Sequence, residues 1–280
     1  MRLRDALSQA AAALAEISDT PRLDAELLMA HALAMSREAM LLDALDAPVP
    51  AVFEELLVRR VAHEPVAYIT GQRDFWTISL AVAPGVLIPR PDSETLIEAA
   101  VDHFGQEGPR TVLDLGTGSG ALLLAALTEW PDARGLGIDA SAEALAIASG
   151  NAARLGLASR ARFAIGDWGE GIAERFDLVL CNPPYVETGT VLAPDVSDHE
   201  PATALFAGAD GLDAYRRLVP QLPGLLSPGG MIALEIGATQ ADAVSALFLK
   251  AGLAPAVRQD LGGRDRAIVH FSLGMGRKGR

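Results

Sequence analysis

The sequence is poor in cysteine and lacks any long apolar run. Its one cysteine, Cys181, excludes an internal disulfide and favours a reducing compartment. No apolar stretch of about 18 residues occurs, so no helix is expected to span a membrane. The amino-terminal segment also lacks the apolar core and cleavage pattern of a signal peptide. We therefore expect a cytoplasmic protein with no membrane partner, in which Cys181 is a small core residue.

Basic residues are scarce as well. The chain has 23 Lys and Arg against 36 Asp and Glu, which gives a formal net charge of -13 at pH 7. Binding through nucleic-acid phosphates needs a basic surface, so this balance argues against direct nucleic-acid binding. Metal-ligand spacing is missing too. Nothing near His31 or His63 has such spacing, and we expect no metal site.

What the chain does contain is enough length for more than one domain. Its 280 residues exceed the usual size of a single domain, about 150 residues, and half of them are hydrophobic. Apolar residues at helical spacing predict a small helical bundle over residues 1–63. From Pro65 the pattern alternates, so residues 66–71 and 75–82 predict a β-hairpin within a linker at 64–88.

Residues 89–280 form the predicted α/β domain. Strand and helix patterns alternate from Arg110 onward, which predicts a mostly parallel sheet with helices on both faces. The last two apolar runs, 254–259 and 266–272, are joined by a short turn and are expected to be antiparallel. The other predicted elements are strands at 111–115, 134–138, 161–165, 176–181 and 230–236, and helices at 121–130, 141–155, 211–226 and 239–251.

Three further expectations concern segments outside these elements. Asp92 or Ser93 is expected to cap a helix that runs through His103. The connection 186–209 is long, and long loops beside a site are often lids. The basic tail, 276–280, is expected to fray.

A glycine-rich loop joins the first strand of this domain to the following helix. Absent side chains let a ligand approach the backbone, and the helix N-terminus can face an anionic group. Asp139 ends the next strand, where it can accept hydrogen bonds from both hydroxyls of a ribose. The pattern predicts a nucleoside cofactor but leaves its identity open, because with Ala121 the loop also fits the dinucleotide motif. The loop residues are Gly116, Thr117, Gly118, Ser119 and Gly120.

Asp167 and Trp168 follow the third predicted strand. Asp167 offers an acceptor for an exocyclic amine, and the Trp168 indole can lie against a purine. Core filling is the alternative for Trp168, since tryptophan is often largely buried. Together with Asp139, the two residues favour an adenosine-containing cofactor.

The stretch Asn182-Pro183-Pro184-Tyr185 follows the fourth predicted strand. Prolines give no N–H to a sheet, so they end the strand and lift the chain off its carboxyl edge. Asn182 and the Pro183 carbonyl can then accept hydrogen bonds from a planar NH2 group, and Tyr185 can cover it. A plain Pro-Pro turn is the alternative. A hydride-transfer enzyme would not need such an acceptor site.

Taken in order, these motifs resemble those of the HemK/PrmC protein-glutamine N5-methyltransferases, and the resemblance covers nearly the whole chain. The residues that carry it are 64–71, Pro89-Arg90-Pro91-Asp92-Ser93-Glu94, Leu113-Asp114-Leu115 with the glycine loop, Asp139, Gly166-Asp167-Trp168, Asn182-Pro183-Pro184-Tyr185, Glu200-Pro201 and Gly208-Ala209-Asp210-Gly211-Leu212.

The resemblance implies a Rossmann-like class I methyltransferase domain at 89–280, preceded by a helical substrate-recognition domain. It implies S-adenosylmethionine as cofactor and class I peptide-chain release factors as substrates, modified on the glutamine of their Gly-Gly-Gln loop. The catalytic residues are then expected to be Asn182, Pro183 and Tyr185. Substrate binding is expected at Asn182, Pro183, Pro184, Tyr185, Arg90 and Glu200.

Other functions stay open on the sequence alone. A ribosomal-protein glutamine methyltransferase would share the same catalytic domain. A DNA adenine N6-methyltransferase would share the Asn182–Tyr185 stretch, although the acidic balance and the lack of a basic target-recognition region argue against it. A dinucleotide-binding dehydrogenase or a non-catalytic nucleoside-binding module is the alternative from another class.

Overall fold

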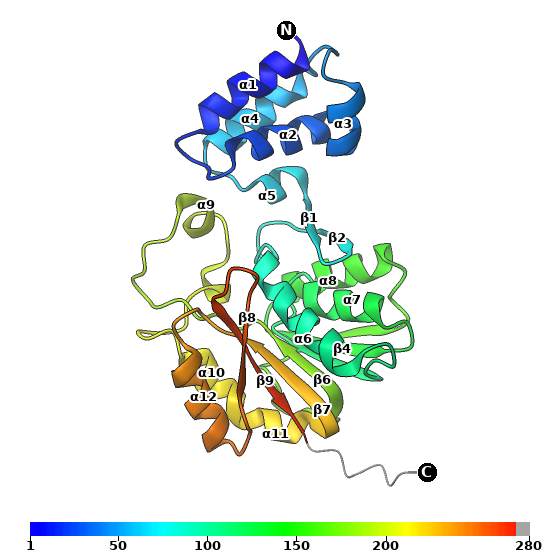
Figure 1. Cartoon of the computed structure of the whole chain (residues 1–280), viewed down its shortest axis with the longest axis vertical. Coiled ribbons are helices and arrows are strands. Elements are labelled where there is room, and N and C mark those ends of the chain that lie inside the picture. Colours follow the sequence, from blue (N-terminus) through cyan, green and yellow to red (C-terminus); the bar gives the residue numbers. More distant parts are fainter. Residues whose placement is uncertain (273–280) are drawn as a thin grey trace. The chain divides into compact units, whose positions relative to one another are not determined.

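The chain divides into two compact units (Figure 1). The computed structural model describes residues 1–272, and the basic tail at 276–280 lies outside this range. The helical unit consists of residues 1–72 together with 192–199. The sheet unit consists of residues 73–191 and the chain from residue 200 onward.

The helical unit is a bundle around one apolar core, which confirms the predicted amino-terminal helical domain. Leu3, Leu7 and Leu14 lie on one face of α1 and are fully buried, and Leu28 and Met29 of α2 pack into the same core. This spacing of three, four and seven residues is what a helix with one buried face requires. The helices are α1 (Leu3–Leu14), α2 (Pro21–Ala32), α3 (Arg37–Asp43), α4 (Val52–Val61), α5 (Val66–Thr70) and the short α9 (Pro194–Ser197).

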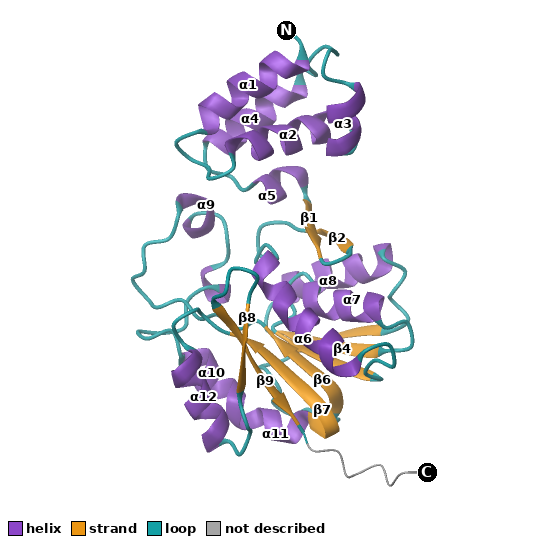
Figure 2. Ribbon diagram, viewed as in Figure 1, coloured by secondary structure: helices purple, strands orange, loops and turns teal. Residues whose placement is uncertain are grey.

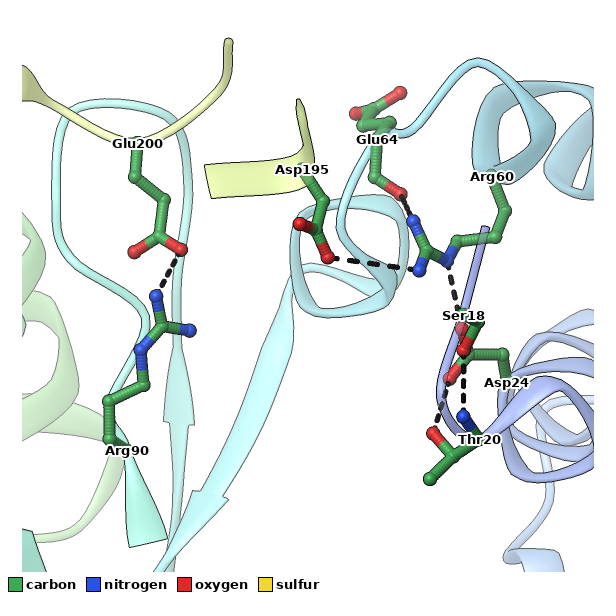
Figure 3. Close-up of polar contacts among 8 residues, drawn as sticks. All are labelled: Ser18, Thr20, Asp24, Arg60, Glu64, Arg90, Asp195 and Glu200. Carbon is green, nitrogen blue, oxygen red and sulfur yellow. Dashed lines mark hydrogen bonds and ion pairs between the residues drawn. The ribbon is translucent and has the colours of Figure 1, made fainter. Parts of the chain in front are cut away.

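Arg60 is a buried cation of the helical unit, and acidic groups surround it (Figure 3). Its Nε donates to Asp24 Oδ2 at 2.9 Å, and its Nη2 lies 3.8 Å from Asp195 Oδ2. The Thr20 hydroxyl reaches the other Asp24 oxygen at 3.4 Å, and the Glu64 carbonyl accepts from Arg60 at 3.5 Å. The buried charge pair is therefore hydrogen-bonded, the condition under which burying it is tolerable.

Glu26 is the other buried acid that pairs with arginine in the helical unit. Arg22 donates to Oε1 at 2.6 Å, and Arg37 donates to Oε2 at 2.7 Å, so each carboxylate oxygen has a partner. Burial opposes ionisation, but the hydrogen bonds from the two arginines outweigh it and hold the pKa of Glu26 below its ordinary value.

The predicted β-hairpin is wrong in its first half. Residues Val66–Thr70 form helix α5, in which Ala67, Tyr68 and Ile69 are all buried. A half-exposed strand would alternate buried and exposed positions, so this run suits a short helix instead. Gly71 ends the helix with φ 71°, a left-handed conformation that favours glycine. The hairpin strands are β1 (Gln72–Phe75) and β2 (Ile78–Ala81).

One sheet runs through the sheet unit (Figure 2). It has seven strands in the order β5-β4-β3-β6-β7-β9-β8. Neighbours from β5 through β7 are parallel, whereas β9 is antiparallel to both β7 and β8, as the sequence predicted. The strands are β3 (Thr111–Leu115), β4 (Arg134–Asp139), β5 (Ala161–Ile165), β6 (Phe176–Cys181), β7 (Leu226–Glu235), β8 (Ala256–Gln259) and β9 (Asp265–Phe271).

Helices cover both faces of this sheet, with α6, α7 and α8 on one side and α10, α11 and α12 on the other (Figure 2). A separate hydrophobic core lies on each face of the sheet. Leu123 and Leu127 of α7 belong to the core on the α6–α8 side, and Tyr215 of α10 and Phe248 of α12 belong to the core on the other side. The helices are α6 (Glu94–Phe104), α7 (Ala121–Glu129), α8 (Ala142–Arg154), α10 (Asp213–Leu218), α11 (Leu222–Leu225) and α12 (Ala241–Lys250).

Two expectations about helices need correction. Ser93 directly precedes α6, but its side chain makes no capping hydrogen bond to that helix. The predicted helix at 211–226 is interrupted, because a 3-10 turn at Val219–Gln221 separates α10 from α11. Pro220 and Pro223 each lack the N–H that a continuous α-helix would use.

Candidate active site

The candidate active site lies at the carboxyl edge of the parallel sheet, where the chain order reverses. β3 pairs with β4 on one side and with β6 on the other, so the loops that follow β3 and β6 diverge from a shared crevice. A cavity of about 430 Å³ opens there, a size typical of small-ligand sites. The predicted residues that line it are Gly116, Gly118, Asp139, Asp167, Trp168, Asn182 and Pro184.

The glycine loop after β3 needs its glycines for geometric reasons. Gly116, Gly118 and Gly120 have φ values of 73°, 55° and 85°, in the left-handed region that side chains disfavour. A Cβ on Gly120 would lie 2.9 Å from the Leu124 side chain, and one on Gly116 would lie 3.4 Å from the Trp168 ring. At Gly116 and Gly118, bare backbone therefore faces the cavity, as a closely approaching ligand requires.

Thr117 and Ser119 are buried, and neither lines the cavity. The Thr117 hydroxyl donates to Asp114 Oδ2 at 2.6 Å, and the Ser119 carbonyl accepts from Asn151 Nδ2 at 2.9 Å. Asn151 also bonds the backbone of Ala81 in both directions. These two loop residues, predicted to bind cofactor, hold the loop in place through their neighbours.

Asp114 belongs to one of the motifs that carry the family resemblance, but the sequence reasoning assigned it no role in the site. Its Oδ2 accepts from Thr117 and from the Leu123 amide, whereas its Oδ1 has no hydrogen-bond partner among the described residues. Burial disfavours the charged form and raises the pKa of Asp114 to about 7. A lone acid within an otherwise apolar strand is the signal that could have identified it.

Asp139 stands at the end of β4 and faces the cavity. Its Oδ2 accepts from the Gly118 amide at 2.8 Å, and its Oδ1 accepts from the Ser141 amide at 2.9 Å. A carboxylate has about four acceptor positions, so each oxygen can take one more donor. This arrangement suits a pair of ribose hydroxyls.

Trp168 and Asp167 follow β5 on the cavity wall. Trp168 has φ 54°, an uncommon conformation for a bulky residue, and such strained positions cluster at functional sites. Its half-buried ring lies next to Gly116, so it closes one side of the cavity. The Asp167 carboxylate forms an ion pair with Arg217, which also lines the cavity.

Asn182 sits where β6 ends, with its amide held at one end. Its Nδ2 donates to the Ser93 hydroxyl at 3.0 Å, which leaves Oδ1 as an acceptor for another donor. Asn182 and Pro184 line the cavity, whereas Pro183 is buried. The Tyr185 carbonyl accepts from Gln240 Nε2 at 3.1 Å, which fixes the backbone after the prolines.

Glu235 is a second residue that the sequence reasoning missed. It ends β7, it is fully buried, and its Oε1 accepts from the Tyr185 hydroxyl at 3.1 Å. Its Oε2 has no hydrogen-bond partner among the described residues. Burial is the main cause that raises the pKa of Glu235 to about 7. As with Asp114, the available signal was a single acid in an apolar strand, here at the last position of the strand.

Arg90 and Glu200 form an ion pair with each other (Figure 3). Arg90 Nη2 lies 2.5 Å from Glu200 Oε1, and Glu200 Oε2 accepts from the Ile88 amide at 3.0 Å. The Glu200 side chain is only 1% exposed, whereas Arg90 keeps 35% of its side chain exposed. Neither residue lines the cavity, so their predicted contact with substrate remains a prediction.

The connection 186–209 is fixed at both ends within the sheet unit. The Val186 amide donates to the Leu205 carbonyl at 2.8 Å, and the Thr188 amide donates to the Gly208 carbonyl at 2.8 Å. Between these ends, residues 192–199 belong to the helical unit. A role of this connection as a lid remains a prediction.

Other predicted features can be compared with residues 1–272. Within this range no helix is long and apolar enough to cross a membrane, and no group of three His, Cys, Asp or Glu side chains could hold a metal ion. Cys181 is buried in β6, and burial raises the pKa of its thiol, as expected for an unreactive core residue.

Comparison with known proteins identifies the family. Residues 5–71 match the PrmC N-terminal domain, and residues 108–248 match a methyltransferase domain. A release factor glutamine methyltransferase of Caulobacter vibrioides is 45% identical over 90% of this chain and 89% of that protein. One from Cereibacter sphaeroides is 45% identical over 96% of this chain and 98% of that protein.

A solved methyltransferase structure has a similar fold. A methyltransferase from Pyrococcus furiosus aligns with a TM-score of 0.55 at 17% identity and covers 79% of this chain and 99% of its own. The motif resemblance and the predicted class I methyltransferase fold are thereby confirmed. The chain belongs to the release factor glutamine methyltransferase family.

Proposed function

We propose that this chain transfers the methyl group of S-adenosylmethionine to the side-chain amide nitrogen of the glutamine in the Gly-Gly-Gln loop of class I release factors. Two relatives named release factor glutamine methyltransferase, each 45% identical over 90% or more of this chain, support the substrate class. The observation that carries the chemistry is the placement of Asn182. It lines the cofactor cavity while its Nδ2 is held by Ser93, so an amide oxygen is available there.

The cavity fits the cofactor in size and in chemistry. Gly116 and Gly118 present bare backbone, and Asp139 offers free acceptor positions for ribose hydroxyls. Trp168 offers an aromatic face for adenine, with Asp167 beside it as an acceptor for the exocyclic amine. When bound, S-adenosylmethionine supplies an electrophilic methyl group on a sulfonium centre.

The residues after β6 would act on the acceptor amide. An amide nitrogen is a poor nucleophile because its lone pair is shared with the carbonyl, and a rotation barrier of about 18–20 kcal/mol measures that sharing. As the nitrogen gains a methyl group its N–H bonds become stronger donors. Hydrogen bonds from these N–H groups to Asn182 Oδ1 and to the Pro183 carbonyl would then stabilise the transition state by about 1.5–3 kcal/mol each. Positioning contributes roughly 7–11 kcal/mol. As the N–C bond forms, the bond between the methyl carbon and sulfur would break and leave S-adenosylhomocysteine. The methylated nitrogen then carries a positive charge and is strongly acidic, so it would lose one proton to water without a strong general base.

The helical unit would bind the large protein substrate. We also propose a cytoplasmic location, because translation termination takes place in the cytoplasm. Residues 5–71 match a domain that takes its name from this enzyme family, whereas the predicted cofactor residues all lie in the sheet unit. With a net charge of -13, direct nucleic-acid binding is not part of the proposal.

Methyl transfer to purified substrates tests this function. The full chain, given radiolabelled S-adenosylmethionine and a release factor, should label one glutamine, located by mass spectrometry. A release factor with Gln→Asn should be a very poor substrate, because the amide retracts by about 1.3 Å and a misplacement near 1 Å can cost about 100-fold. Gln→Glu should abolish labelling, because no NH2 remains. Faster labelling of a ribosomal protein or of duplex DNA would reject the proposal.

A further inference from the structure

The turn after β5 carries the two residues proposed to bind adenine, and one neighbouring segment holds it on both sides of Trp168. Before Trp168, the Asp167 carboxylate forms an ion pair with Arg217 of α10. After Trp168, the Gly169 amide donates to Gln221 Oε1 at 2.9 Å. Gln221 ends the 3-10 turn that follows α10. Residues four apart in a helical segment lie on one face, so Arg217 and Gln221 reach the same turn.

Gln221 fixes the backbone next to Trp168. Its Nε2 donates to the Arg217 carbonyl at 2.9 Å, so both ends of the Gln221 amide are bonded. Gly169 is buried, and a Cβ on it would lie 2.5 Å from the Leu225 side chain. Trp168 keeps a φ of 54° in this setting, and such a conformation persists only where the surrounding structure over-determines it. The bond from Gln221 therefore helps to hold Trp168 on the cavity wall.

Arg217 is the one side-chain partner of the Asp167 carboxylate among residues 1–272. It binds Oδ2, which leaves Oδ1 as an acceptor for another donor. Both side chains line the cavity, with 47% of Asp167 and 62% of Arg217 exposed. An exposed ion pair adds little to stability, so stability does not account for the place of this pair on the cavity wall.

The ion pair selects one direction for the Asp167 carboxylate. Without a partner, the side chain can occupy three staggered positions about its first side-chain bond. An acceptor that is already in the binding position gains by the inverse of the fraction it would otherwise spend there, a factor of about three for three equal positions. The 6-amino group is the only N–H donor on the adenine base of a nucleoside, so it is the group that benefits.

We propose that Arg217 and Gln221 form a clamp on the adenine-binding turn. Arg217 is a specificity residue that aims the Asp167 carboxylate at the 6-amino group, and Gln221 is a positioning residue that holds Trp168 against the purine face. The clamp rests on the proposed function for its ligand, whereas its tests measure binding and need no methyl acceptor. The two residues act on different parts of the base, so their losses should differ in kind.

The first test compares S-adenosylhomocysteine with the analogue that carries hydrogen in place of the 6-amino group. Titration calorimetry on the full chain measures both dissociation constants, and their ratio isolates the amino group. The native chain should bind S-adenosylhomocysteine at least about tenfold more tightly, as expected of a hydrogen bond to a charged acceptor. In Arg217→Met this ratio should fall about threefold. Both bases are uncharged, so the lost charge of Arg217 changes the two affinities alike and leaves the ratio to report on Asp167.

Arg216→Met is the matched control for Arg217→Met. Arg216 also belongs to α10, but it pairs with Asp210 and Asp213 and does not line the cavity, so the native ratio should persist. Arg217→Lys should keep most of the ratio, because an ammonium group can still donate to Asp167. An unchanged or larger ratio in Arg217→Met would overturn the proposal, because Arg217 would then have no influence on the carboxylate or would compete with adenine for it. Equal falls in both Met variants would overturn it too.

The second test separates Gln221 from Arg217. Gln221→Met keeps the length of the side chain but removes the acceptor of the Gly169 amide. Both ligands should then bind about two- to tenfold more weakly, and their ratio should stay native. Bound ligand should quench tryptophan fluorescence, and the part of the quenching that is lost in Trp168→Phe should be reduced in Gln221→Met. Native affinity and native quenching in Gln221→Met would reject the role of Gln221.

These measurements also separate the clamp from methyl transfer. A chain that binds both ligands with the expected ratios but methylates no release factor would reject the proposed function and support the clamp. A chain that binds neither ligand would overturn the clamp and the cofactor site together.

Discussion

The two units of the chain treat buried acids differently. In the helical unit, Asp24 and Glu26 are each paired with arginine, and both oxygens of each carboxylate are occupied. In the sheet unit, Asp114 and Glu235 lie within strands of the sheet and each has an oxygen without a partner in the described chain. Such an atom costs about 1–3 kcal/mol, so the sheet unit tolerates a cost that the helical unit avoids.

The difference separates charges that support the fold from charges that serve the site. Glu200 of the sheet unit follows the paired pattern, with both oxygens bonded. Among residues 1–272, the buried acids that break it are Asp114, next to the glycine loop, and Glu235, next to the Asn182–Tyr185 stretch. A buried polar group without a hydrogen-bond partner is expected where a residue is retained for function and not for stability.

The largest effect is expected from breaking a pair in the helical unit. Arg60→Ala leaves Asp24 buried without its cation, which should destabilise this unit by about 3–5 kcal/mol. Amide hydrogen exchange in the cores of α1 and α2 measures the change. Arg59→Ala is the matched control, because Arg59 is 43% exposed in its pair with Glu64 and should cost less than about 1 kcal/mol. Equal effects of the two variants would contradict the importance of burial.

The next effect should appear in the sheet unit as a dependence of stability on pH. The folded pKa of Glu235, about 7, lies above its ordinary value of 4.5, so the native state binds the extra proton between these values. Its contribution is therefore complete below pH 4.5 and lost as pH rises through 7, a total of roughly 3 kcal/mol. Glu235→Gln should flatten the curve by about 1.4 kcal/mol per pH unit in this window.

Tryptophan fluorescence during chemical unfolding can follow this slope, because Trp76, Trp130 and Trp168 all lie in the sheet unit. Asp242→Asn, which changes an exposed acid of α12, is the control and should leave the slope as it is. A slope unchanged by Glu235→Gln would mean that Glu235 stays ionised throughout the range.

Sequence patterns predicted the features that depend on local residue types. The order of strands and helices, the glycine loop and the placement of Asn182 follow from periodicity and from turn chemistry, and the sheet confirms the predicted fold. Local patterns could not show that Ser93, distant in the chain, holds Asn182 instead of capping α6. Nor could they show which oxygen of Asp114 or Glu235 lacks a partner, because packing of several elements decides that.

A smaller effect is expected at Asp139, which forms no ion pair within the described residues. Asp139→Ala removes the proposed acceptor of the ribose hydroxyls and should weaken cofactor binding by about 1–3 kcal/mol. Calorimetry with S-adenosylhomocysteine measures the change, and Asp139→Asn, which keeps one acceptor oxygen, should lose less. An unchanged affinity in Asp139→Ala would reject the ribose assignment.

The smallest effect should come from exposed ion pairs, whichever unit holds them. Arg162 and Glu174 of the sheet unit pair at 3.1 Å with side chains 66% and 60% exposed, and Arg4 and Asp46 of the helical unit pair with 54% and 62% exposed. Water screens both pairs, so Arg162→Ala and Arg4→Ala should each change stability by about 0–1 kcal/mol. Chemical unfolding measures both. A stability loss near 3 kcal/mol in one unit but not in the other would mean that exposed charges also contribute differently to the two units. Two small losses restrict the difference to buried acids.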